Sequence, residues 1–227
     1  MANRSYLYDL LTPDGMQIHS ILLLVCGTSL LLAIPFAGRV SQITDSAIGD
    51  LHLPSAFFVL YTLFMALVGL NRGTLAAHRR DMAYGKALVV GQVLVAQALV
   101  VPFLVFVRAI FPGAAGRIAL VASYVTLTTL ASGLIGLAIE SRALRTGKSS
   151  FPLRHLVILA YFVVPVFLGF ADHAAARYVS VLSPLSTVLQ LLTGLPVAVG
   201  VVAFLLPIAI VIPLFASGRR GPQGDGR

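Results

Sequence analysis

The sequence contains little charge, a single cysteine and no tryptophan. Only 11% of its 227 residues are charged, whereas 58% are hydrophobic and the mean hydropathy is +0.95. A water-soluble domain carries about 25% charged residues to cover itself with a polar surface, so this composition excludes a cytosolic enzyme and a secreted module. The lone Cys26 excludes a disulfide or a thiolate metal cluster within the chain. The composition therefore predicts an integral membrane protein.

Acidic residues are also scarce, and none lies inside a long apolar run. All Asp and Glu residues fall in connections or at the ends of apolar runs. Ionisable residues at membrane depth usually mark ion coupling or catalysis, so the pattern argues against a proton- or sodium-driven transporter and against an intramembrane aspartyl protease. The histidines also lie near the ends of the runs, which argues against a bis-histidine haem site. We expect no catalytic residue, cofactor-binding residue or metal ligand in this chain, and thus no enzyme.

Six apolar stretches are long enough to cross the hydrocarbon core of a bilayer, which takes about 20 residues in a helix. They are residues 16–37, 53–70, 87–107, 118–139, 153–171 and 195–216. The connections between them are too short to fold independently. The sequence therefore predicts an all-α integral membrane protein with six transmembrane helices, a single domain over residues 1–227 that ends in a short cytoplasmic tail, residues 218–227.

The basic residues predict the orientation of these spans. With six spans both termini lie on one side of the membrane, and twelve Lys and Arg residues then lie on that side against four on the other. Because positive residues accumulate on the cytoplasmic side, both termini are expected in the cytoplasm. A net charge of +8 in a membrane protein serves topology and anionic headgroups. We therefore expect contact with membrane lipids and no nucleic-acid partner.

A seventh apolar stretch, residues 179–192, lies between the fifth and sixth spans. At about 14 residues it is too short to cross the membrane and too apolar for a solvated loop. Two interpretations of equal weight stay open. The stretch is either a re-entrant segment that shapes an outer gate, with Ser183, Pro184 and Gln190 as candidate gate residues, or a helix that lies on the membrane surface.

Span four carries a stripe of hydroxyl side chains. The stripe recurs every three positions, at Ser123, Thr126, Thr129 and Ser132. Residues three apart share one face of a helix, and such a face either packs against a neighbouring helix or lines a polar pathway. Packing is favoured, because Ser and Thr hydroxyls bond to carbonyls of their own helix. Gln92 and Gln97 in span three need a partner at depth, on a neighbouring helix or along a translocation path.

The connection between spans two and three, residues 71–86, is basic. Thr74 is a suitable N-cap for a short helix. One face of that helix then collects four side chains: Leu75, His78, Arg79 and Met82. We expect the helix to lie parallel to the membrane, where it either binds anionic headgroups or docks into a cytoplasmic partner.

Residues 146–149, Thr-Gly-Lys-Ser, look like the end of a phosphate-binding P-loop. That motif needs a glycine five residues before Gly147, where Arg142 stands. No strand is predicted ahead of it either. The sequence therefore contains no ATPase motif.

Three passages resemble the membrane subunit of type-2 ABC transporters, a permease family of bacterial exporters. The first joins Arg72-Gly73-Thr74-Leu75 to Gly85-Lys86-Ala87, similar to the family's "G-T-L" run after span two and its "G-K" at the entry to span three. The second is Thr129 to Leu137 followed by Glu140-Ser141-Arg142, similar to the family's "iGLl-S" end of span four. The third is Leu182-Ser183-Pro184-Leu185, placed like the family's "sP" between the last two spans. The resemblance covers about residues 53–217.

This resemblance implies the permease subunit of an ATP-driven exporter in the bacterial inner membrane. The subunit would form a homodimer or a heterodimer with a related permease. Each permease would sit on a separate P-loop ATP-binding subunit, which would carry ATP and magnesium. Residues 74–84 would be the coupling helix that fits a groove in that subunit. Its contact residues would be Thr74, Leu75, His78, Arg79, Arg80, Met82 and Tyr84. The alternative is a non-transporting membrane subunit that anchors or assembles a larger complex through the same basic connections.

Overall fold

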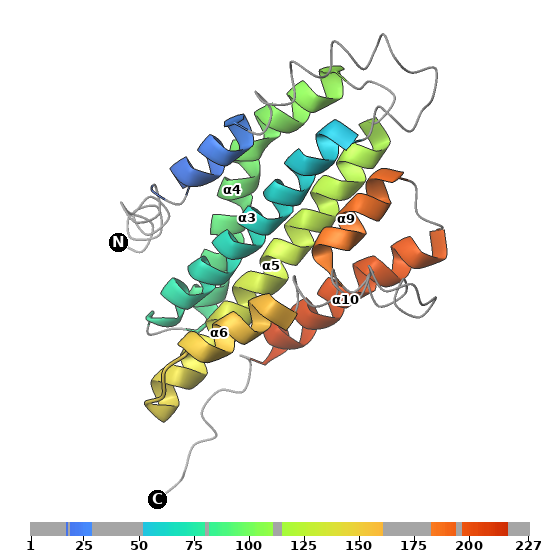
Figure 1. The fold of residues 1–227 in the computed structure, drawn as a ribbon. Coiled ribbons are helices and arrows are strands. Elements are labelled where there is room, and N and C mark those ends of the chain that lie inside the picture. The colour runs from blue at the N-terminus through green and yellow to red at the C-terminus, as the bar shows by residue number, and fades with distance from the viewer. Residues whose placement is uncertain are drawn as a thin grey trace, which may run out of the picture.

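The computed structural model describes residues 17, 19–28, 52–79, 82–110, 115–160, 183–193 and 197–217. Within these ranges the protein is entirely helical, with seven helices and no strand. The first helix covers His19–Thr28. The other six are α3 (His52–Ala77), α4 (Met82–Ile110), α5 (Ala115–Thr146), α6 (Phe151–Ile158), α9 (Pro184–Thr193) and α10 (Val197–Ala216) (Figure 1).

Three helical stretches are long and apolar enough to cross a membrane. They are Phe57–Ala77, Met82–Ala109 and Ala115–Thr146, which match the second, third and fourth predicted spans. Large apolar side chains on the outside of the bundle are exposed, among them Leu94 of α4 and Ile212 of α10. Exposed apolar surface of this kind is unfavourable in water and normal for helices that contact lipid tails. The fold is therefore that of a helical membrane protein.

The remaining predicted spans are described in part. α10 covers most of the predicted sixth span, residues 195–216. The structure describes residue 17 and His19–Thr28 of the first predicted span, and residues 153–160 of the fifth. The other residues of these two spans, and the tail at residues 218–227, lie outside the described ranges. The six-span topology and the cytoplasmic position of both termini therefore stay predictions.

α3 and α5 are longer than the apolar runs that predict them. α3 continues to Ala77 and α5 to Thr146, beyond the predicted ends at residues 70 and 139. At 1.5 Å per residue a 32-residue helix is about 48 Å long, against about 30 Å for the hydrocarbon core. Hydropathy sets where a helix leaves the lipid and not where it ends. α5 ends at Thr146, directly before Gly147, whose positive φ of 65° favours glycine.

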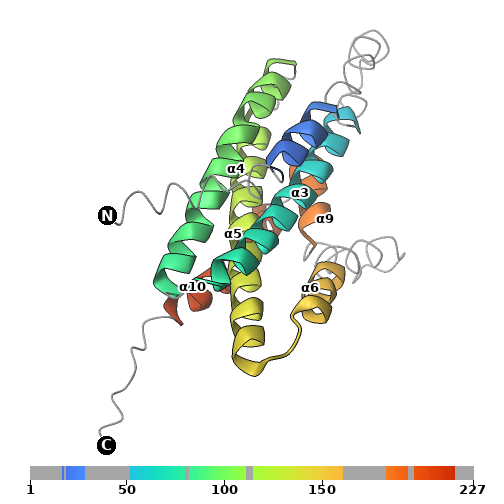
Figure 2. The ribbon, with the colours of Figure 1, turned by 90° about the vertical axis from the view of Figure 1, so that its left-hand side faces the viewer.

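The closest packing in the bundle joins α3 and α5, although α4 lies between them in the sequence (Figures 1 and 2). A Cβ atom added to Gly69 would overlap the carbonyl oxygen of Thr129, and one added to Gly73 would overlap that of Gly133. Small residues at a membrane helix contact let the two backbones approach this closely. Glycine therefore fixes where α3 crosses α5.

Two apolar cores lie along this crossing. The larger core surrounds the first half of α3, where the rings of Phe57 and Tyr61 stack at 6.0 Å between centroids. Tyr124 of α5 and Phe204 of α10 close it with an edge-to-face contact at 5.4 Å. The smaller core surrounds the end of α3 and includes Val89 of α4. α5 contributes to both cores and is the central helix of the bundle.

Candidate functional site

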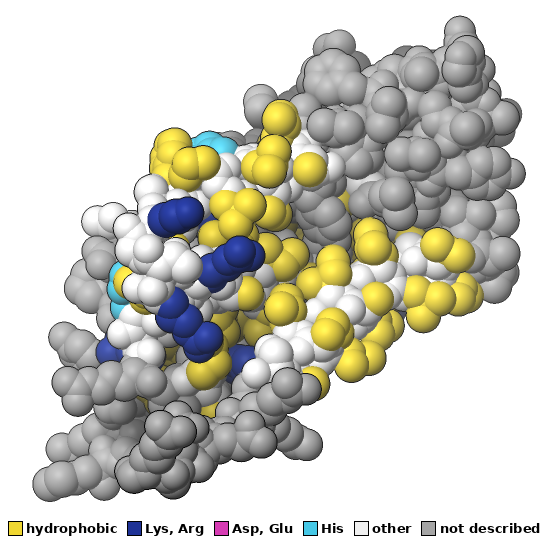
Figure 3. Space-filling model, turned by 90° about the horizontal axis from the view of Figure 1, so that it is seen from below, with side chains coloured by type: hydrophobic (Ala, Val, Ile, Leu, Met, Phe, Trp, Pro, Cys, Tyr) yellow, Lys and Arg dark blue, Asp and Glu magenta, His cyan; other side chains and the backbone are white. Residues whose placement is uncertain are grey.

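Basic residues gather at one end of the bundle, which we call the basic end. Because α3, α4 and α5 alternate in direction, the α3–α4 and α5–α6 connections lie at the same end (Figure 1). The described Lys and Arg residues of these segments are Arg72, Arg79, Lys86, Arg142, Arg145, Lys148 and Arg154. The opposite end has Arg108 and Arg117 among the described residues. Figure 3, seen from below, shows Lys and Arg side chains gathered at the basic end.

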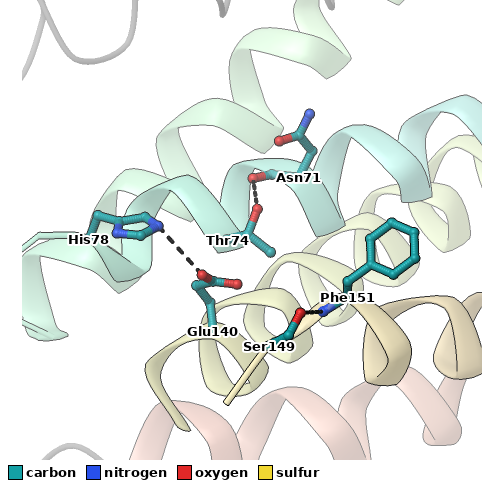
Figure 4. A network of polar contacts seen from close by, with 6 residues as sticks. All are labelled: Asn71, Thr74, His78, Glu140, Ser149 and Phe151. Carbon is teal, nitrogen blue, oxygen red and sulfur yellow. Dashed lines mark hydrogen bonds and ion pairs between the residues drawn. The ribbon is translucent and has the colours of Figure 1, made fainter. Parts of the chain in front are cut away.

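The α3–α4 turn is tied to α5 by a histidine–carboxylate contact. His78 Nε2 lies 3.5 Å from Glu140 Oε1 (Figure 4). The His78 side chain is 57% exposed, whereas the Glu140 side chain is only 13% exposed. Glu140 is the one acidic residue in the described part of the chain. On the other side of the turn, Ser141 Oγ lies 4.0 Å from Met82 Sδ, so α5 contacts both ends of the connection.

The predicted coupling helix over residues 74–84 is wrong as a separate element. Thr74 is inside α3, where its hydroxyl donates to the carbonyl of Asn71 at 2.7 Å and caps no new helix (Figure 4). Two backbone bonds close the turn, from the amides of His78 and Arg79 to the carbonyls of Leu75 and Ala76. α4 then starts at Met82. The physical reason is the contact of Gly73 with α5, which keeps α3 helical beyond its apolar run.

The residues predicted for coupling are divided between surface and interior. Leu75, His78 and Arg79 are exposed at the turn. Thr74 is buried, and Met82 and Tyr84 are half-buried on the first turn of α4. Arg80 lies outside the described residues. The structure thus brings three of the predicted side chains onto one surface that a partner could contact.

Three of the four hydroxyls in the α5 stripe form hydrogen bonds within their own helix. The hydroxyls of Ser123, Thr126 and Thr129 donate to the carbonyls four residues earlier, at 2.9, 2.8 and 2.6 Å. Thr129 is fully buried at the α3 crossing, and Ser132 is buried as well, whereas Ser123 is exposed. These contacts favour packing over a polar pathway for this stripe.

The two glutamines of the third predicted span lie on α4. Gln97 Oε1 accepts a hydrogen bond of 2.7 Å from the hydroxyl of Tyr61 on α3. Gln92 is buried closer to the basic end. Gln97 therefore joins two packed helices, as expected for an amide at membrane depth.

Of the predicted outer-gate residues, Pro184 and Gln190 belong to α9, and Ser183 directly precedes it. Ser183 and Pro184 are buried at its start, and Gln190 is half-buried near its end. α9 packs against α3 and α5, and Arg117 Nη1 donates to the carbonyl of Leu192 at 2.9 Å. This bond places the last turn of α9 beside the first turn of α5, at the end opposite the basic end. Ten residues span about 15 Å, so α9 is a half-length helix, and one of its faces packs against α3 and α5.

A cavity at the basic end was not predicted. It has a volume of about 540 Å³ and lies between α4, α5 and α10. Its basic lining residues are Lys86, Arg142 and Arg145, and we call it the basic cavity. The sequence contained one signal for it, because Leu134, Leu137, Ala138, Ser141, Arg142 and Arg145 follow helical spacing on one face of α5. Nothing in the sequence indicated that α10 faces them.

Lys86 forms part of the cavity wall and holds the end of α10. It is 7% exposed, and its Nζ donates to the carbonyl of Phe215 at 2.8 Å. The same ammonium lies 5.9 Å from the centre of the Phe215 ring. A cation at the carboxyl end of a helix bonds its free carbonyls and matches its dipole. Lys86 thus joins the first turn of α4 to the last turn of α10.

The described residues hold no group of three His, Cys, Asp or Glu side chains that could bind a metal ion. Comparison with known proteins gives no further assignment. No protein-family model matches the chain, and no curated protein or solved structure is significantly similar to it. The basic end and its cavity are therefore the features from which a function is argued.

Proposed function

We propose that this protein is the membrane-spanning permease subunit of an ATP-driven ABC transporter, an exporter in the bacterial cytoplasmic (inner) membrane. The resemblance of three sequence passages to type-2 ABC permeases and the exposed basic end support this proposal. A separate P-loop subunit would bind and hydrolyse ATP with magnesium, so this chain performs no catalytic step. A second permease subunit, identical or related, would complete the transporter.

The observation that carries the proposal is the contact between the α3–α4 turn and α5. His78 is exposed where a cytoplasmic partner would dock, and Glu140 is enclosed against the bundle. Leu75 and Arg79 add an apolar and a basic side chain to the same surface. A partner that displaces this turn acts on α5 through the His78–Glu140 contact as well as on α3 and α4 through the chain.

The α3–α5 crossing would transmit such a displacement across the membrane. The glycine contacts at Gly69 and Gly73 leave no space for the two helices to slide past each other. Packed elements of this kind move as units between discrete arrangements. Closure of two ATP-binding subunits would move the basic ends and bias the spans between inward-facing and outward-facing states. Pro184 and Gln190 of α9, together with Ser183 directly before it, lie in the opposite half and would form the outer gate.

A second candidate is a non-transporting subunit that anchors or assembles a larger membrane complex. The observation that favours it is the α5 stripe: the hydroxyls of Ser123, Thr126 and Thr129 are bonded to their own helix, and Thr129 is buried against α3. A subunit without a polar pathway of its own would use the exposed basic turn to dock a partner and would transport no substrate.

Affinity purification in mild detergent tests the proposal and separates the two candidates. The tagged chain should retain a stoichiometric P-loop subunit with ATPase activity. Leu75→Asp, on the exposed turn, should release that subunit, whereas the matched variant Arg108→Glu, at the opposite end, should retain it. A different membrane complex on the wild-type protein would support the anchoring role, and the chain purified alone and inactive would contradict both.

A further inference from the structure

We infer that the basic cavity binds the phosphate headgroup of an anionic phospholipid from the leaflet at the basic end. Among the described residues, three basic side chains line the cavity and no carboxylate does. The one described acidic residue, Glu140, does not line it and contacts His78. An anion is therefore the ligand that the cavity's charge requires.

Lys86 is the central observation, because its charge lies within the wall. Long basic side chains usually extend their charged ends into water, but Lys86 is buried and is held against Phe215. A buried charge is unfavourable unless it is paired. The ammonium has three N–H donors, and the Phe215 carbonyl accepts one of them. No carboxylate among the described residues forms an ion pair with Lys86, and a phosphate in the cavity would supply the opposite charge.

Arg142 and Arg145 would bind the same phosphate from the mouth of the cavity. Both are exposed on the last turns of α5, on the face that lines the cavity. Guanidinium groups bind phosphate oxygens with paired hydrogen bonds. The nearby hydroxyls of Thr146 and Ser217 already donate to backbone carbonyls of their own helices, so the three cations are the main donors to the ligand.

The apolar part of the wall indicates a lipid as the source of the phosphate. Along one face of α5 the lining changes from Leu134 and Leu137 to Ser141 and then to the two arginines. Leu214 of α10 continues the apolar wall. A free phosphate ion makes no favourable contact with this apolar surface, whereas the glycerol and first acyl carbons of a phospholipid would pack against it. Basic pockets between membrane helices on the cytoplasmic side bind anionic lipid headgroups.

The size and position of the cavity fit the same ligand. Its volume of about 540 Å³ falls in the range of small-molecule sites and exceeds what one phosphate fills. Ile212 and Phe215, on the last turns of α10, are exposed. Exposed apolar side chains beside the cavity place its mouth at the edge of the lipid layer, from which a headgroup can enter sideways.

A single tryptophan can report the lipid directly, because the sequence contains none. We would introduce Leu214→Trp in the cavity wall and, as a matched control, Phe106→Trp on the lipid-exposed side of α4 at the opposite end. Each variant would be reconstituted into vesicles that hold the same fraction of brominated lipid, either phosphatidylglycerol or phosphatidylcholine. Brominated phosphatidylglycerol should quench the tryptophan fluorescence of Leu214→Trp more strongly than brominated phosphatidylcholine does. The two lipids should quench the fluorescence of Phe106→Trp equally. Ser217→Trp at the cavity mouth serves as a second reporter if Leu214→Trp does not fold.

The charge variants then test which residues bind the headgroup. Lys86→Gln, Arg142→Gln and Arg145→Gln should each weaken the preference for phosphatidylglycerol about fivefold, whereas Arg108→Gln should leave it unchanged. Equal quenching of Leu214→Trp by both lipids, with no charge variant added, would overturn the proposal. If inorganic phosphate abolished the preference for phosphatidylglycerol, the cavity would still be a phosphate site. The proposal that a lipid supplies the phosphate would be overturned.

Discussion

Gly73 of α3 lies directly against the carbonyl oxygen of Gly133 of α5, so no side chain fits between the two helices at this point. Gly69 and Gly136 make the same kind of contact one turn away on either helix, against the carbonyl oxygens of Thr129 and Leu70. In lipid, close backbone packing takes the place that the hydrophobic effect has in water. These glycines therefore determine the arrangement of the two helices that form the centre of the bundle.

Gly73→Ala should destabilise the protein, because its Cβ would displace the α5 backbone. Overpacking a tight contact usually costs about 1–3 kcal/mol, and we expect a lower midpoint of thermal unfolding in detergent. Gly116→Ala is the matched control, since nothing lies within 4 Å of a Cβ at that position of α5. The control should be neutral or slightly stabilising, because alanine favours a helix over glycine. Equal midpoints for the two variants would refute the role of Gly73.

Glu140→Gln should loosen the α3–α4 turn without unfolding the protein. The substitution keeps the size of the side chain and removes its charge, so the contact with His78 weakens. Because His78 is largely exposed, the loss should be below about 1 kcal/mol. Limited trypsin digestion in detergent should then cut after Arg79 about two- to fivefold faster. Cleavage after Lys148, in the α5–α6 connection, should keep its rate, and a uniform increase at both sites would instead mean global destabilisation.

Cysteine labelling tests which side of the membrane holds the basic end. In a Cys26→Ala background, Lys148→Cys reports the α5–α6 connection and Gly116→Cys the first turn of α5, and both native residues are exposed. A membrane-impermeant maleimide should label Gly116→Cys in intact cells and Lys148→Cys only in inverted vesicles. The reverse pattern would overturn the predicted orientation.

Charge reversal at the α3–α4 turn tests coupling to an ATPase. Under the proposed function, Arg79→Glu combined with Arg80→Glu should uncouple ATP hydrolysis from transport, because the turn would then repel the surface of the ATP-binding subunit that a basic turn would attract. The wild-type complex in lipid nanodiscs should hydrolyse ATP at a rate different from that of the isolated ATP-binding subunit. The complex of the double variant should hydrolyse ATP at the rate of the isolated ATP-binding subunit. The complex of Arg108→Glu should keep the rate of the wild-type complex. A double variant that couples normally would count against the permease assignment.

The central helices could be predicted well, and their ends poorly. The runs at residues 53–70, 87–107 and 118–139 correspond to α3, α4 and α5, because a chain in lipid must satisfy its backbone hydrogen bonds within each segment. The separate coupling helix was wrong, since Thr74 belongs to α3. Its N-cap signal was local, whereas the contact of Gly73 with α5 that extends α3 is a tertiary one.

The sequence predicted only those features of the candidate site that depend on contacts within a single helix. The α5 hydroxyls bond within their helix as their spacing favours. The His78–Glu140 contact, the Lys86 bond to Phe215 and the basic cavity all join helices far apart in the sequence. Periodicity shows which side chains share a helix face, but it does not show which helix that face meets.

The sequence by itself determined that this is a helical membrane protein with its positive charge concentrated in particular connections. Hydropathy and the count of Lys and Arg are properties of composition and order, so no structure is needed to evaluate them. Only the tertiary structure decided that α3 crosses α5, that α9 is a half-length helix packed against both, and that Lys86 meets Arg142 and Arg145 at one cavity. These features depend on the close fit of non-consecutive helices, where a missing side chain at Gly73 matters as much as any side chain that is present.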